Sequence, residues 1–139
     1  MSEQPAPKHI GKSILAILAG FVVVVAISIG TDVILELTGV LPKIGTRLSD
    51  SQALLATVYR TIYGVVGSYV TARLAPNKPM KHALIGGAIG IVIATIGAAV
   101  TWNHVPSLGP HWYPVSLIIG ALPTAWLGAQ IYIMQTGSR

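Results

Sequence analysis

The sequence predicts an all-α fold: a four-helix transmembrane bundle with up-down-up-down order and both termini in the cytoplasm. Of its 139 residues, 53% are hydrophobic and only 9% are charged, whereas an ordinary soluble domain carries roughly 25% charged residues. The apolar residues fall into four blocks, each close to the ~20 residues that a helix needs to cross a bilayer. The connections between these blocks are short, and together with the two tails they hold most of the basic residues. Too little polar surface remains to cover a soluble globule.

The first predicted span covers residues 13–37. It follows a polar segment, residues 1–12, which we expect to be a disordered cytoplasmic tail. The four consecutive valines at residues 22–25 would favour a β-strand in water. In lipid, an unpaired strand leaves its backbone polar groups unsatisfied, so a helix is expected instead.

A cleaved signal peptide is the alternative interpretation of this region. Lys8 and Lys12 precede an apolar stretch, and the small residues Ala26 and Ser28 are typical of a cleavage site. Apolar character continues beyond this point to Leu37, which favours a retained span.

Three further spans follow, separated by connections rich in proline and glycine. The second span follows a group of residues that can cap a helix N-terminus, Ser49, Asp50 and Ser51. Pro123 lies inside the fourth span and should bend that helix. The four spans form a single domain at residues 13–134, followed by a short cytoplasmic tail at residues 135–139. The second, third and fourth spans cover residues 52–74, 80–101 and 115–134.

Orientation follows from the lysines and arginines, which are enriched in cytoplasmic loops. An N-terminus inside the cell places six of these residues on the inner side and two on the outer side, so both termini are expected in the cytoplasm. His82 would then be a solvated anchor at the inner interface. The inner residues are Lys8, Lys12, Arg73, Lys78, Lys81 and Arg139, and the outer residues are Lys43 and Arg47.

The connection before the fourth span is aromatic. Trp102, Trp112 and Tyr113 are typical of the belt at a membrane interface, with an aromatic ligand platform as the alternative. His104 and His111 share this connection but have no acid beside them, and the chain has no cysteine. No metal site and no cofactor are therefore expected.

Small residues recur at i, i+4 spacing in every span. In lipid, helices associate through close backbone approach rather than through burial of hydrocarbon. The pattern therefore predicts a tight intramolecular bundle in which sequential helices are antiparallel neighbours, with a homodimer face as the alternative. The predicted packing residues are Gly64, Ser68, Gly86, Gly90, Gly120 and Gly128.

Charged residues inside the spans are the strongest candidates for a site. Asp32 and Glu36 lie four residues apart and therefore share one helix face. At 1.5 Å per residue, Arg60 lies about 13 Å below the outer start of the second span, and Asp32 about 7 Å below the outer end of the first. Because an arginine side chain extends several Å toward water, an Asp32–Arg60 pair is expected. Glu36 would be a second acceptor, with Tyr63 one turn from Arg60.

This predicted charge cluster has two interpretations. As a structural latch, the pair would offset the cost of a charge in the membrane and fix the register of the first two helices. As a coupling device, an acid tuned by an adjacent arginine would take part in a proton or ion pathway. The position of the cluster near one surface, rather than at the membrane centre, favours the latch.

Five stretches of the chain carry a family resemblance. They are TDVILE at residues 31–36, YRTIYGVVGSYVTARLAP at 59–76, PMKHA at 79–83, GPHWYP at 109–114 and ALPTAWLG at 121–128. Together they resemble a family of small, uncharacterised bacterial four-span integral membrane proteins. The resemblance implies this architecture and a bacterial inner-membrane location, and no particular activity. The chain is also similar in size to small multidrug-resistance transporters, but its first-span acids lie at the helix end rather than at the centre.

The expected function is that of a small polytopic inner-membrane protein, non-enzymatic and structural or accessory, because no nucleophile–base spacing is present. The alternative is a small proton- or cation-coupled transporter, dimeric because four helices enclose little volume. A lipid enzyme would need Asp32, Glu36, His104 and His111 to meet at the outer surface. The expected partners are the lipid bilayer and either a second copy or a membrane complex. Nucleic acid is not expected, since the basic residues set orientation.

Overall fold

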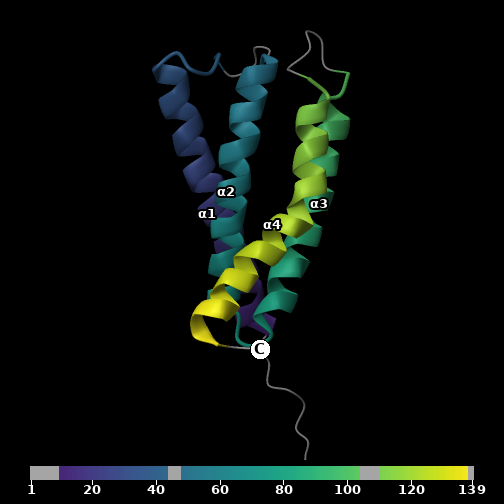
Figure 1. Ribbon diagram of the computed structural model, residues 1–139. Coiled ribbons are helices and arrows are strands. Elements are labelled where there is room, and N and C mark those ends of the chain that lie inside the picture. Colours follow the sequence, from purple (N-terminus) through teal and green to yellow (C-terminus); the bar gives the residue numbers. More distant parts are fainter. Residues whose placement is uncertain (1–9, 44–47, 104–109, 138–139) are drawn as a thin grey trace, which may run out of the picture.

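The computed structural model describes residues 10–43, 48–103 and 110–137, and these residues form an all-helical bundle. The helices alternate in direction: the α1–α2 and α3–α4 connections lie at one end of the molecule, and the α2–α3 connection lies at the other (Figure 1). The elements are α1 (Ile10–Leu37), α2 (Asp50–Leu74), α3 (Pro79–Thr101) and α4 (Trp112–Thr136).

The first helix is longer than expected. α1 begins at Ile10, so residues 10–12 are helical and do not belong to the predicted tail. Lys12 is compatible with a helix because a lysine near a helix end reaches solvent along its own apolar stem. Residues 1–9 of the predicted tail lie outside the described residues. The helix is unbroken to Leu37, through the small residues that raised the signal-peptide alternative.

The fourth helix also begins earlier than expected, at Trp112 rather than at residue 115. Pro114 falls in its first turn, where the missing backbone N–H has no helical partner to lose. The helix ends after Thr136, beyond the predicted residue 134, at a left-handed Gly137. Pro123 lies at mid-helix, and Figure 1 shows α4 change direction part-way along its length.

Local sequence signals mark the start of α2 and the turn between α2 and α3. Ser49 caps α2, and it forms a reciprocal capping box with Gln52. α2 ends at Leu74, where the chain turns toward Pro79, the first residue of α3. Lys78 occupies the left-handed region at φ 41° in that turn, which is uncommon for a side chain of its size. The turn brings α3 back along the bundle within a few residues.

α2 lies at the centre of the bundle. It packs against α1, α3 and α4, whereas no α1–α4 contact forms among the described residues. The expectation that sequential helices are close neighbours is correct for α1–α2 and for α3–α4. It also holds for α2–α3, although the largest interface joins α2 to α4, two helices that are not sequential and run in the same direction. Chain connectivity favours antiparallel pairs, but here the small side chains decide which helices approach most closely.

Glycines mark the closest crossings. A Cβ added to Gly128 on α4 would lie 2.5 Å from the Val65 backbone oxygen, and one added to Gly64 on α2 would lie 2.7 Å from the Thr124 methyl carbon. A Cβ on Gly20 of α1 would lie 2.7 Å from the Gly67 backbone oxygen of α2. Ser68 packs against Gly128. Gly64, Ser68 and Gly128 are thus packing residues, as predicted.

The other three predicted packing residues do not pack. A Cβ on Gly90 would meet nothing within 4 Å, and those on Gly86 and Gly120 would meet single atoms at 3.9 Å. The α3–α4 crossing instead uses Gly87, whose added Cβ would lie 2.9 Å from the Ala125 methyl. Small residues at i, i+4 spacing allow contact but equally leave space where no ridge from a neighbour fills it. At Gly86, Gly90 and Gly120 no neighbouring side chain fills the space beside the glycine.

Residue size is distributed as expected for a protein in lipid. The buried apolar residues of the described chain are mainly alanines, and no large side chain there is fully buried. Large aliphatic side chains such as Val22, Ile93 and Ile119 point outward and are more than half exposed. Three helices, α1, α3 and α4, are long and apolar enough to cross a membrane. α2 does not belong to this group, because it carries more polar residues than any other helix.

Candidate functional site

Asp32 and Arg60 form an ion pair between α1 and α2. An Arg60 Nη donates to a carboxylate oxygen of Asp32 at 2.5 Å. Both side chains are about 30% exposed. The antiparallel arrangement of α1 and α2 places the acid and the cation at one level, as the depth calculation from the sequence predicts. The pair therefore connects the halves of these two helices that lie nearest the α1–α2 connection.

Tyr59 supplies a second hydrogen-bond donor to the Asp32 carboxylate. Its hydroxyl donates to the second Asp32 carboxylate oxygen, and its side chain is buried. The Arg60 guanidinium also lies 5.7 Å from the centre of the Tyr59 ring, a cation–π distance. Both oxygens of the carboxylate thus have protein donors, so the negative charge is satisfied without an external ligand.

The remaining members of the predicted cluster lie apart from this pair. The Tyr63 hydroxyl bonds to the Thr31 hydroxyl at 2.7 Å, and its ring lies 5.6 Å from that of Tyr59. Glu36 is half-buried and makes no ion pair with Arg60. The guanidinium is directed at Asp32, and Glu36 lies one helical turn farther along α1. The interpretation of Glu36 as a second acceptor is therefore wrong.

Sequence reasoning missed Tyr59. Its signal was present, because Tyr59 and Tyr63 lie four residues apart on the helix that carries Arg60. Two phenols on one face of a polar span supply donors for a carboxylate on the neighbouring helix. Tyr59 is adjacent to Arg60 in the sequence, and residues i and i+1 of a helix point in different directions. The sequence alone therefore does not indicate that both side chains reach Asp32.

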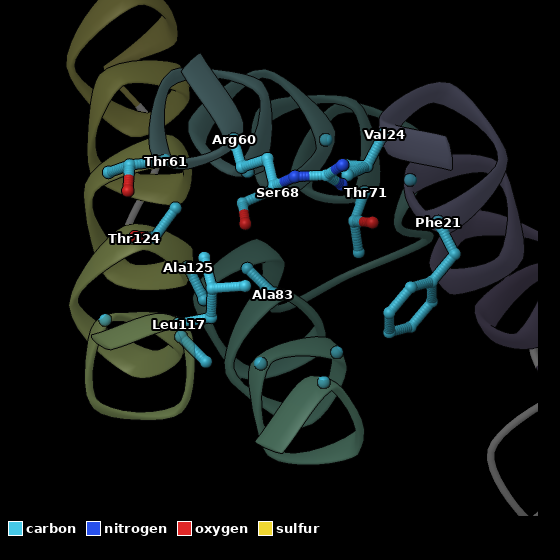
Figure 2. A pocket seen from close by; sticks show the side chains of 18 of the residues that line it. Phe21, Val24, Arg60, Thr61, Ser68, Thr71, Ala83, Leu117, Thr124 and Ala125 are labelled. Atoms are coloured by element: carbon cyan, nitrogen blue, oxygen red, sulfur yellow. The ribbon is translucent and has the colours of Figure 1, made fainter. Parts of the chain in front are cut away.

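A cavity of about 180 Å³ lies between the four helices beside the pair (Figure 2). Arg60 is one of its lining residues and Asp32 is not. Gly86, Gly90 and Gly120, the three predicted packing residues that do not pack, all line this space. The cavity therefore exists because these positions have no side chains.

The polar groups of the cavity lie on α2 and α4. Thr71 donates to the Ala16 carbonyl at 3.1 Å and Ser116 to the Tyr113 carbonyl at 2.7 Å, so both hydroxyl protons are used. The hydroxyls of Thr61, Ser68 and Thr124 form no hydrogen bond with any described residue, and Figure 2 shows that of Ser68 directed toward the central space. The cavity thus has unused hydroxyl donors. The Arg60 Nε also lacks a partner among the described residues, but it is buried and not open to this space.

His82 closes the end of the bundle that carries the α2–α3 connection. Its Nε2 lies 2.7 Å from the Ser13 hydroxyl of α1, and its Nδ1 lies 3.0 Å from the Lys78 carbonyl. Because a carbonyl only accepts, Nδ1 donates, and in the neutral ring Nε2 accepts from Ser13. His82 is only 6% exposed, so the prediction of a solvated anchor is wrong. It connects α1 to α3, which otherwise share little contact.

Aromatic residues hold the opposite end of the bundle, where α2 and α4 begin. Trp112 donates from its indole to Asp50 at 3.1 Å, which joins the first turns of α4 and α2. His111 stacks on Trp102 at 3.9 Å and bonds to the Trp102 carbonyl. His104 lies outside the described residues, and no cluster of metal-ligating side chains forms within them. These aromatic contacts support the outer turns.

Together, an all-helical bundle, outward-facing large aliphatic residues, an alanine-rich interior and three helices of membrane-spanning character define a helical-bundle membrane protein. A scan against protein-family models and searches of curated proteins and of solved structures found no match to this chain. The geometry of the charge pair and of the cavity is therefore the basis for assigning a function.

Proposed function

We propose that this chain is a non-enzymatic, four-span protein of the bacterial inner membrane with a structural or accessory role, in which Asp32 and Arg60 form a latch. The observation that carries the proposal is the state of the Asp32 carboxylate. Both of its oxygens accept hydrogen bonds from α2, one from Arg60 and one from Tyr59. A carboxylate held in this way fixes two helices relative to each other.

The proposal includes α2 as the fourth span, with both termini in the cytoplasm. α2 is 25 residues long, about 37 Å at 1.5 Å per residue, which exceeds a hydrocarbon core of ~30 Å. Its polar residues are sheltered by the three apolar helices that surround it. The lipid bilayer is the principal partner, and a second copy or a larger membrane complex fits an accessory role.

A coupled transporter is the second candidate, and the cavity is the observation that favours it. A coupling acid must exchange its proton with the space in which substrate binds. In this bundle the group that lines the cavity is Arg60, and Asp32 lies behind it. The arrangement therefore supports the latch more strongly than proton coupling.

Proton release separates the two candidates. Tetraphenylphosphonium, a lipophilic cation, would be added to purified protein in weakly buffered detergent solution while pH is recorded. We expect no release above that of Asp32→Asn, because both carboxylate oxygens are held by Arg60 and Tyr59 and the acid does not line the cavity. Glu36→Gln is the matched control, since it removes an acid of the same helix that lies outside the pair. About one proton released per chain by the wild type and by Glu36→Gln, but not by Asp32→Asn, would establish coupling.

A further inference from the structure

The cavity has two chemically different walls. α1 and α3 contribute only carbon atoms and glycines, including Phe21, Val24 and Gly90. α2 and α4 contribute the unpartnered hydroxyls of Thr61, Ser68 and Thr124 together with Arg60 (Figure 2). Small-molecule sites commonly combine an apolar lining with a few convergent polar groups. An occupant of this cavity would be apolar on one side and would hydrogen-bond on the other.

The charge balance of the cavity selects against ions. The positive charge of Arg60 is matched by Asp32 behind it, so the pair presents no net charge to the space. What remains unmet in the space itself are the hydroxyls of Thr61, Ser68 and Thr124, which have no hydrogen-bond partner among the described residues. A hydroxyl without a partner can donate to the oxygen of a bound molecule, and that hydrogen bond strengthens binding. The geometry therefore favours a neutral molecule that carries an oxygen acceptor.

The volume of the cavity and the route into it further restrict the class of molecule that can bind. An engineered cavity of 150 Å³ holds a benzene ring, so a space of about 180 Å³ admits a single ring with a short substituent. α1 and α3 form the weakest interface of any helix pair that is in contact. Figure 2 shows Phe21 of α1 on the side of α3, at the edge of the cavity. A molecule dissolved in lipid would reach the cavity between these two helices, past Phe21.

We propose that this cavity is a binding site for a small, neutral, lipid-soluble carbonyl compound, bound with its oxygen toward Arg60 and the hydroxyl-bearing wall and its hydrocarbon toward α1 and α3. This site goes beyond the proposed structural role and does not depend on it. A latch holds the two outer half-helices whether or not the space below it is filled.

Fluorine NMR of the purified protein in detergent micelles tests the proposal with three probes of one shape. 4-Fluoroacetophenone is neutral with a carbonyl acceptor, 1-ethyl-4-fluorobenzene has no acceptor, and 4-fluorobenzoate is an anion. We expect the ketone to bind about threefold to tenfold more tightly than the hydrocarbon, since a hydrogen bond from an unpartnered hydroxyl of the cavity wall is at stake. Equal binding of ketone and hydrocarbon would overturn the role of the donors, and tightest binding of the benzoate would overturn the neutral class.

Paired glycine substitutions distinguish the cavity from the micelle. Gly90→Leu places a side chain in the cavity, whereas Gly30→Leu adds the same group to an exposed site on α1 with open space around it. Ketone binding should fall at least about tenfold in Gly90→Leu and stay unchanged in Gly30→Leu, as a filled site requires. If Gly90→Leu does not fold, Gly120→Leu fills the same cavity from α4. Unchanged binding in a folded cavity-filling variant would overturn the proposal.

Discussion

Replacing Gly128 with alanine should unfold the bundle at a markedly lower temperature than the wild type. The added Cβ would lie 2.5 Å from the Val65 backbone oxygen and 2.8 Å from the Tyr69 backbone nitrogen. Backbone atoms of a packed helix cannot give way as a side-chain end can, so α2 and α4 must separate. Overpacking of this kind costs about 1–3 kcal/mol or more, and it strikes the largest interface of the bundle.

Gly120→Ala is the matched control on the same helix. Its added Cβ would meet only the Thr124 hydroxyl, at an ordinary 3.9 Å. Alanine is a better helix former than glycine by about 1 kcal/mol, so this variant should be as stable as the wild type or more so. Thermal unfolding in detergent, followed by circular dichroism, gives the comparison. Equal destabilisation by the two substitutions would contradict the α2–α4 crossing described above.

Arg60→Leu and Asp32→Leu should each destabilise the protein, and the double substitution should recover most of the loss. Each single change leaves the opposite charge without its main partner, and an unpaired charge at a helix centre costs about 2.5–3.5 kcal/mol on insertion scales. Since both side chains are about 30% exposed, we expect the lower part of that range or less. The double variant leaves no charge and should lie within about 1 kcal/mol of the wild type.

A double-mutant cycle of unfolding free energies in mixed micelles measures this coupling. We expect an interaction free energy of about 1–2 kcal/mol between the two positions. Glu36→Leu with Arg60→Leu is the control cycle, because Glu36 makes no ion pair with Arg60. Additive losses in the Asp32–Arg60 cycle, with no recovery in the double variant, would show that the pair is not a latch.

The Asp32–Arg60 pair could be predicted because it follows from one-dimensional quantities. Helix rise fixes the depth of each residue, short connections fix which helices are neighbours, and the cost of a lone charge in lipid demands a partner. The donor from Tyr59 and the separation of Glu36 depend on helix rotation about the long axis. Hydrophobicity sets that rotation poorly in a span that is polar on one face and surrounded by other helices.

The glycines show a second limit of the sequence. Gly64 and Gly90 have the same local pattern, yet the Thr124 methyl packs against the first and nothing reaches the second. Whether a missing side chain becomes a contact or a void depends on the opposing helix. That helix is α4 for Gly64, and the pairing of α2 with α4 is not encoded in any loop. Likewise, burial of His82 depends on Ser13 lying opposite it, 69 residues away.

We expect α2 to cross the membrane between apolar neighbours although it is the least apolar helix. The chain has no cysteine, so Ser51→Cys and Asn77→Cys place single exposed thiols near the two ends of this helix. Intact spheroplasts would be treated with a membrane-impermeant maleimide before and after permeabilisation. We predict that the cysteine at residue 51 reacts in intact cells and the one at residue 77 reacts only after permeabilisation. Labelling of both positions from the same side would show that α2 does not cross the membrane.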